Sequence, residues 1–266
     1  MQEEGGGLGL PQMTEIELMQ RLLCEDKERS QDEPAIAASI GEQMLHMDLM
    51  PLPRSMRARI RDVCSRVKTK NAILVGGGIG HLTAWLFDLW CGSLEENVVS
   101  SGNKPETLRI IEPGTRFGVI IDRLIRRYAA ESWAVVIAKP WQEVSAESAS
   151  GMAAGIALSE SVQQTILPMP PDLVIIDLPE EERATAASTA FDLISPGGMV
   201  LVQEPTVPTG DVGAPEEGKV PTQAQSKVKS FNDWIGVIKR VDKYHSLGFV
   251  ELTGGTLVAL LRTNSE

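Results

Sequence analysis

The sequence has little cysteine and no long apolar run. Its only cysteines, Cys24, Cys64 and Cys91, are too few and too scattered for a disulfide framework or a zinc site. No stretch approaches the ~18 consecutive apolar residues that cross a bilayer, and the amino-terminal residues show neither the basic nor the apolar region of a secretion signal. These absences predict a soluble protein of the reducing cytoplasm, with no membrane as a partner.

Basic residues are also scarce. The sequence has 25 lysines and arginines against 36 aspartates and glutamates, which leaves a net charge of -11. This balance argues against a general binder of nucleic acid, because the phosphate backbone attracts clustered positive charge. One basic run remains, and we expect it to form the solvated face of a helix rather than a binding surface. It consists of Arg57, Arg59, Arg61, Arg66, Lys68 and Lys70.

Glycine, by contrast, is concentrated after a short apolar run at residues 71–75. Glycines occupy positions 76, 77, 78 and 80, and apolar residues then resume with helical spacing. This pattern predicts a strand, a turn and a helix start, which is where α/β proteins hold nucleotides. A side chain in such a turn would clash with a ligand close to the backbone. The spacing Gly-x-Gly-x-Gly departs from the dinucleotide fingerprint Gly-x-Gly-x-x-Gly, which disfavours a nicotinamide oxidoreductase.

Further apolar runs alternate with helical patterns along the chain. The early runs are apolar without alternation, which is typical of a parallel sheet covered on both faces. The last two runs are joined by a tight turn, which predicts an antiparallel hairpin. We expect strands at 71–75, 108–111, 133–138, 171–177, 198–202, 248–252 and 256–261, and helices at 35–50, 55–67, 116–128, 145–167, 181–193 and 230–244.

Composition divides the chain into a short tail and one domain. Residues 1–34 are polar and are predicted to form an amino-terminal tail, partly disordered or helical. Residues 35–266 are predicted to form a single domain, because this length can bury a full core. Residues 205–228 are rich in Pro, Gly, Thr, Glu and Gln, and we expect a long loop there.

This order of elements and motifs resembles the class I S-adenosylmethionine-dependent methyltransferase fold. The similar motifs are Leu74–Gly80, Glu112 after the second strand, Pro171–Asp177 and Leu193–Val202. Within the fold, the chain is most similar to the small-molecule O-methyltransferase family that includes the caffeoyl-CoA and catechol enzymes. Val228-Lys-Ser-Phe-Asn232, a helix, a strand and a Gly-Gly turn match that family's carboxy-terminal motifs. The sequence thus predicts an α/β fold with a Rossmann-like, doubly wound sheet of seven strands, mostly parallel, with an antiparallel strand in the carboxy-terminal hairpin.

The resemblance implies S-adenosylmethionine as the cofactor and assigns residues to its site. Glu112 is expected to accept hydrogen bonds from the ribose hydroxyls, although it is also placed to cap the following helix. His81 is expected at the methionine carboxylate, or else on the surface, and Trp141 beside the adenine, or else in the core. The cofactor-binding set implied in this way is Gly76, Gly77, Gly78, Gly80, His81, Glu112, Trp141 and Asp177.

The catalytic residues of the family are matched less well. Its members bind a divalent metal through an Asp after the fourth strand and an Asp-Asn pair after the fifth strand. Here Asp177 fits the first position, whereas the pair is Gln203-Glu204. Asp177 and Glu204 are therefore the candidate catalytic residues, and Asp177, Gln203 and Glu204 the candidate ligands of Mg²⁺ or another divalent cation. The family's second Asp and its Lys become Pro179 and Glu180, which leaves no obvious general base or charge partner.

The leading hypothesis is a methyltransferase that acts on a hydroxyl of a small-molecule acceptor, acting as a homodimer. The first alternative is a protein that keeps the fold without catalysis and serves as a binding or scaffold subunit. The second is an aminopropyltransferase, since Gly76–Gly78 and Val202–Pro205 are similar to the polyamine synthases. Asp177-Leu-Pro-Glu departs from the acidic signature of that family.

Overall fold

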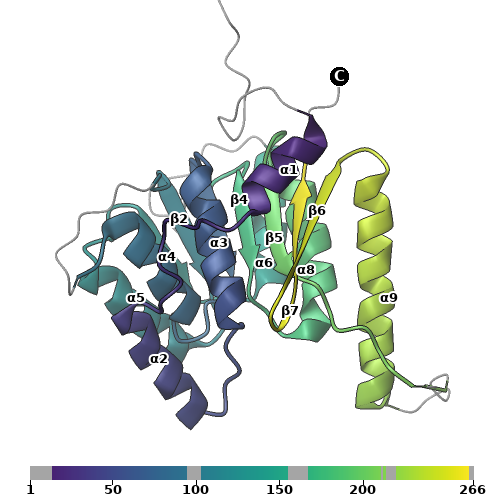
Figure 1. Ribbon diagram of the computed structural model, residues 1–266, viewed down its shortest axis with the longest axis horizontal. Helices are drawn as coiled ribbons and strands as arrows, with labels where there is room; N and C mark the ends of the chain where they lie inside the picture. Colours follow the sequence, from purple (N-terminus) through teal and green to yellow (C-terminus); the bar gives the residue numbers. More distant parts are fainter. Residues whose placement is uncertain (1–13, 95–102, 155–166, 211, 214–219, 264–266) are drawn as a thin grey trace, which may run out of the picture.

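The protein is built around one mixed sheet of seven strands in the order β3-β2-β1-β4-β5-β7-β6 (Figure 1). The computed structural model describes residues 14–94, 103–154, 167–210, 212–213 and 220–263. Strands β1 to β5 are parallel, and β7 runs antiparallel to both β5 and β6. The predicted fold class is therefore confirmed. The strands are β1 (Asn71–Val75), β2 (Thr107–Ile111), β3 (Ala134–Ile137), β4 (Leu173–Ile176), β5 (Met199–Gln203), β6 (Ser246–Leu252) and β7 (Gly255–Leu261).

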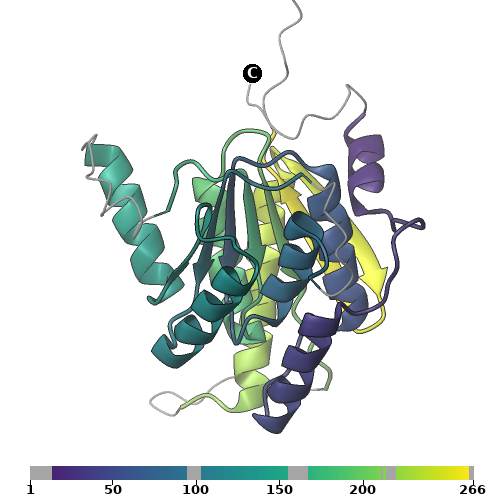
Figure 2. The same cartoon turned by 90° about the vertical axis from the view of Figure 1, so that its left-hand side faces the viewer.

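Helices cover both faces of the sheet, and Figure 2 shows the amino-terminal helices, in purple and blue, on one side and α6 on the other. In β1, Ala72 and Leu74 join the core under the first group of helices, whereas Ile73 and Val75 join the core under the second group. Because both faces are buried, the strand is apolar from Ala72 to Val75. The helices are α1 (Glu15–Leu23), α2 (Ala35–His46), α3 (Arg54–Arg66), α4 (His81–Cys91), α5 (Thr115–Arg127), α6 (Trp141–Ala154), α8 (Glu180–Leu193) and α9 (Gln223–Asp242).

Two helix starts differ from the sequence-based expectation by more than one residue. Helix α6 begins at Trp141 instead of 145, and residues 155–166 of the helix expected there lie outside the described residues. Helix α9 begins at Gln223, several residues before the expected start at 230, which shortens the loop expected at 205–228. The reason is a capping box, in which the Thr222 hydroxyl accepts from the Gln225 N–H and the Gln225 side chain accepts from the Thr222 N–H.

The basic run of α3 serves the interior of the protein, so the expectation of a solvated face is wrong for most of the run. Arg57 and Arg61 are only 5% and 4% exposed. Arg59 and Arg66 donate to backbone carbonyls at the end of α1, including an Arg66 bond of 2.9 Å to the Leu22 oxygen. Cations at a helix carboxyl end satisfy carbonyls that have no partner within the helix. The role of these arginines thus depends on which segments lie next to α3 in the fold, and the basic run itself does not reveal this.

Helix α1 packs against β6 and α3 (Figure 1). Its residues Met19, Leu22 and Leu23 are buried. Met19 and Leu23 lie over Gly248 of β6, where a Cβ atom would come within 2.8 Å of both side chains. Part of the predicted tail is therefore a helix whose apolar side chains are buried in the core. Within the described residues, no helix is long and apolar enough to cross a membrane.

Candidate active site

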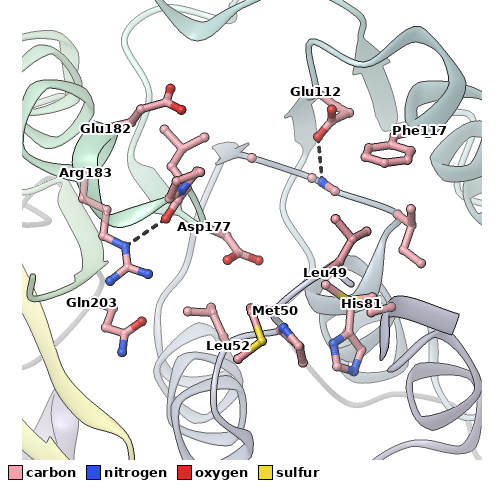
Figure 3. Close-up of a pocket in the computed structure, with 18 of the residues that line it drawn as sticks. Leu49, Met50, Leu52, His81, Glu112, Phe117, Asp177, Glu182, Arg183 and Gln203 are labelled. Atoms are coloured by element: carbon pink, nitrogen blue, oxygen red, sulfur yellow. Dashed lines mark hydrogen bonds between the residues drawn. The ribbon is translucent and has the colours of Figure 1, made fainter. Parts of the chain in front are cut away.

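A cavity of ≈ 650 Å³ opens at the carboxyl ends of the central strands. Strand order reverses beside β1, whose neighbours are β2 and β4, and such switch points are where open α/β sheets bind ligands. Figure 3 shows Glu112 and Phe117 on one side of this cavity, Asp177, Arg183 and Gln203 on another, and the segment from Leu49 to Leu52 facing them. Its lining residues come from the glycine turn, the residues after β2 and β4, the end of α2 and the segment before α3.

The glycine turn forms the floor of the cavity. Gly76, Gly78 and Gly80 have φ values of +88°, +52° and +92°, which disfavour any residue with a Cβ atom. A Cβ at Gly76 would lie 2.0 Å from the Asp177 carbonyl oxygen, so the two strand ends touch there. A Cβ at Gly78 would meet nothing within 4 Å. Since Gly78 and Gly77 line the cavity, the turn presents bare backbone to open space.

Glu112 caps the helix that follows it and also lines the cavity. Its Oε1 accepts from the N–H of Gly114, the N-cap residue of α5, at 2.8 Å. Its Oε2 accepts from the Gly78 N–H at 2.7 Å (Figure 3). Burial raises the pKa of Glu112, and the two N–H donors oppose this rise. The carboxylate thus ties the glycine turn to the start of α5 and lines the cavity, and each oxygen keeps a second lone pair for a ligand.

Asp177 places a carboxyl group in the same cavity. Burial is the main cause that raises its pKa to about 7, and the negative charge of Glu112 adds to the rise. Arg183 and Arg57 act in the opposite direction. A carboxyl group with this pKa exchanges a proton near neutral pH, which is the property of a general base or acid. These two arginines are the charge partners that the sequence did not reveal.

Arg183 belongs to the first turn of α8. It lies three residues after Glu180, so the two side chains are on the same side of the helix. Its Nε donates to the Leu178 carbonyl oxygen at 2.9 Å, which orients the guanidinium (Figure 3). Burial lowers its pKa. The carboxylate of Glu180, which stands at the family's lysine position, accepts from the Thr206 N–H at 2.9 Å. Glu180 thus fastens the segment after β5 to α8, and Arg183 supplies a cation to the cavity.

The three predicted metal ligands do not converge. Gln203 lines the cavity with Asp177, and its amide nitrogen donates to the Gly254 carbonyl at 3.0 Å. Glu204 lies off the cavity and accepts from the Trp234 indole N–H at 3.1 Å. Successive residues at a strand end point to opposite faces, which separates the pair. Over the described ranges, no three His, Cys, Asp or Glu residues form a metal site. The donor set therefore does not fit a divalent cation that prefers six oxygens.

His81 lines the cavity but is buried, so the surface alternative does not hold. Its Nε2 lies 2.6 Å from Oε1 of Glu33, which also accepts from Arg57 at 2.9 Å and from the Trp85 indole at 3.3 Å. Burial and the charge of Arg57 lower the pKa of His81. Arg57 donates in addition to the Leu52 carbonyl. The Glu33 cluster (Glu33, Arg57, His81 and Trp85) thus holds the wall of the cavity that contains Leu52.

Trp141 is the first residue of α6. It is 3% exposed and belongs to the core that also contains residues of α8 and α9. It is not among the residues that line the cavity, so its position matches the core alternative, and stacking on adenine remains a prediction without structural support. The aromatic residue that does line the cavity, next to Glu112, is Phe117.

The architecture is similar to that of solved O-methyltransferase structures. The chain superposes on a Bacillus cereus O-methyltransferase in complex with SAH, with a TM-score of 0.53 and 12% identity over 92% of this chain and 96% of the other. It also superposes on the Streptomyces achromogenes O-methyltransferase TomG, which is involved in tomaymycin synthesis and was solved with SAM, with a TM-score of 0.54 and 13% identity over 99% of this chain and 100% of TomG. The chain has the O-methyltransferase fold.

A third O-methyltransferase-fold structure, from Staphylococcus aureus, is provisionally described as a caffeoyl-CoA O-methyltransferase. It matches with a TM-score of 0.58 and 13% identity over 93% of this chain and 96% of the other. No protein-family model and no curated protein matches the sequence. The similarity therefore lies in the backbone arrangement, and the roles of residues in this O-methyltransferase fold must be argued from the cavity itself.

Proposed function

We propose that the protein is an S-adenosylmethionine-dependent methyltransferase that acts on a hydroxyl group of a small molecule. The observation that carries the proposal is that one cavity joins the bare glycine backbone and the buried Glu112 to the Asp177 carboxyl. Two solved structures of the same fold hold SAH or SAM. The part of the cavity beside the glycine turn and Glu112 suits a nucleoside with an amino-acid tail. The part beside Asp177 suits the group that receives the methyl.

Each of the residues that line the cavity then has a defined role. Gly76, Gly77 and Gly78 admit the methionine portion against the backbone, and Glu112 accepts hydrogen bonds from the ribose hydroxyls. When bound, S-adenosylmethionine supplies a methyl group on a sulfonium, whose S–C bond breaks as the acceptor's O–C bond forms. Asp177 takes the proton that the acceptor hydroxyl gives up. Alignment of the oxygen and exclusion of water supply the rest of the rate enhancement.

We propose that this transfer needs no divalent cation. The support is the separation of Glu204 from the cavity and the presence of two arginines near Asp177. Arg183 and Arg57 stabilise negative charge on Asp177, and this positive charge is part of what a metal ion supplies in related chemistry.

Isothermal titration with S-adenosylmethionine tests the cofactor site. We expect saturable binding to the wild-type protein and binding at least about tenfold weaker for Glu112→Ala, since charge-assisted hydrogen bonds are lost. Absence of binding, or equal affinity of the variant, would contradict the proposal. Binding without turnover of any hydroxylated acceptor would favour the scaffold alternative. A cytoplasmic location and a homodimer complete the proposal, and light scattering after gel filtration tests the dimer.

A further inference from the structure

Arg183 is a cation of the cavity wall that makes few hydrogen bonds to the protein. Within the part of the chain that the structure describes, its hydrogen bond from Nε to Leu178 is the only one, and Asp177, Glu180 and Glu181 act on it through their charge alone. Arg57, the other cation near Asp177, does not line the cavity and is already bound to Glu33 and to the Leu52 carbonyl. Arg183 therefore presents a fixed guanidinium edge with unused donors.

The nearby acidic groups do not take up this edge. The Glu180 carboxylate is bound to the N–H and the hydroxyl of Thr206. Asp177 faces the same cavity with a pKa near 7, so it is only partly charged at neutral pH. Glu182 lines the rim and is exposed to solvent. Figure 3 shows the Arg183 guanidinium between Asp177 and Gln203, on the inner side of the helix.

The wall opposite is apolar. Leu52 is buried at 6% exposure, and Met50 is 89% exposed although it lines the cavity. Leu49 and Pro53 extend this wall. A ligand here lies between an apolar surface on one side and Asp177 with Arg183 on the other, which suits a flat apolar body with polar groups at one end.

We propose that the methyl acceptor is a hydroxylated carboxylic acid whose carboxylate is bound by the guanidinium edge of Arg183. The inference rests on the proposed function and names the acceptor class for that same site. A guanidinium fork matches a planar carboxylate with two parallel hydrogen bonds, and such pairs are short and strong. The carboxylate anchored in this way holds a hydroxyl of the same molecule near Asp177.

The charge around the cavity favours a carboxylate over a phosphate. Glu112, Asp177 and Glu182 all line the same space, and together they repel a doubly charged group more strongly than a singly charged one. The protein as a whole carries a net charge of -11, which adds to this discrimination.

Calorimetric titration in the presence of SAH tests the acceptor site without requiring turnover. The probes are hydroxybenzoates and hydroxycinnamates, each paired with its methyl ester, which keeps the ring and the hydroxyls but removes the charge. For the wild-type protein we expect at least one acid to bind about tenfold tighter than its ester, the ratio of one charge-assisted pair. Arg183→Met should remove this preference, and Arg183→Lys should restore part of it.

Arg126→Met is the matched control, because Arg126 is 68% exposed on α5 and pairs only with Asp122. It should leave every affinity unchanged. Equal binding of acids and esters by the wild type, or no binding of any acid, overturns the inference. A loss of S-adenosylmethionine affinity in Arg183→Met that equals the loss for the acid also overturns it, because Arg183 would then hold the cofactor's carboxylate. Failure of the wild type to bind S-adenosylmethionine would instead contradict the proposed function.

Discussion

At the scale of single residues, the site depends on where charge is buried. Asp177 has a pKa of about 7 because it lies inside the cavity, although Arg57 and Arg183 are near. The sequence singled out Asp177 through its resemblance to the O-methyltransferase family, in which an Asp follows the fourth strand. The two arginines near it could not be found in this way. Arg57 lies far from Asp177 in the sequence, and Arg183 belongs to a helix whose orientation depends on how it packs against the sheet.

The pH dependence of methyl transfer should report the ionisation of Asp177. We expect the rate to rise with pH to a plateau, with a midpoint near 7, because the carboxylate form accepts the hydroxyl proton. Asp177→Asn should lower the rate at least about 100-fold and abolish this limb of the profile. An unchanged midpoint in a variant that is still active would disprove the assignment of the base.

The same substitution should stabilise the folded protein at high pH. The pKa of Asp177 is higher in the folded state than in the unfolded chain, so ionisation disfavours folding as pH rises from about 4 to about 7. Urea denaturation should therefore give equal free energies of unfolding for wild type and Asp177→Asn at pH 4, and at pH 8 a variant more stable by about 1–2 kcal/mol. A variant less stable at pH 8 would contradict the burial of charge at this position.

At the scale of elements, segments before the first strand complete the cavity and the core. Glu33 precedes α2, yet it holds His81 of α4 and Arg57 of α3. Arg57 in turn holds the Leu52 carbonyl in the cavity wall. Composition alone assigned residues 1–34 to a polar tail, because the apolar residues of α1 are few and their partners on β6 come more than 200 residues later.

Removal of the Glu33 carboxylate should weaken the fold much more than removal of its neighbour. Glu33→Ala removes the ion-pair partner of the buried Arg57, and we expect a loss of about 2–4 kcal/mol in the free energy of unfolding. Asp32→Ala breaks an ion pair with Arg54 in which the side chains are 91% and 51% exposed, so the loss should stay below about 1 kcal/mol. Chemical denaturation of both variants measures the difference, and equal losses would count against the Glu33 cluster.

Helix α1 offers a second matched pair. Leu22 is 0% exposed and Ile16 is 72% exposed on the same helix. Leu22→Ala should destabilise the protein by about 2–4 kcal/mol through the cavity it leaves, whereas Ile16→Ala should change stability by less than about 0.5 kcal/mol. If both variants unfold at the wild-type denaturant concentration, α1 is not part of the cooperative core.

At the scale of the whole molecule, one sheet gathers the site from distant parts of the chain. The carboxyl ends of β1, β2 and β4 meet because these strands are neighbours in the sheet. Strand order also decides what stays out of the site. Gln203 reaches the cavity at the end of β5, while Glu204, the next residue, turns to Trp234 on the opposite face.

Removal of divalent cations should therefore leave the enzyme intact. We expect EDTA treatment followed by desalting to change neither the rate of methyl transfer nor the melting temperature, because the predicted ligands do not converge. Glu204→Gln should likewise keep its rate within about twofold, since the amide oxygen still accepts from Trp234. A loss of activity on EDTA treatment that Mg²⁺ restores would show that the cavity holds a metal in solution.

The amino-acid sequence was enough to predict the seven strands, the glycine turn, and the positions of Glu112 and Asp177 after β2 and β4. These features are local, because apolar runs, glycine spacing and strand ends are visible in adjacent residues. The packing of the folded chain was needed to show that Arg183 and His81 line the cavity and that Glu204 and Trp141 do not. The physical reason is that burial and side-chain direction depend on which distant segments pack together, and no spacing within one segment records that choice.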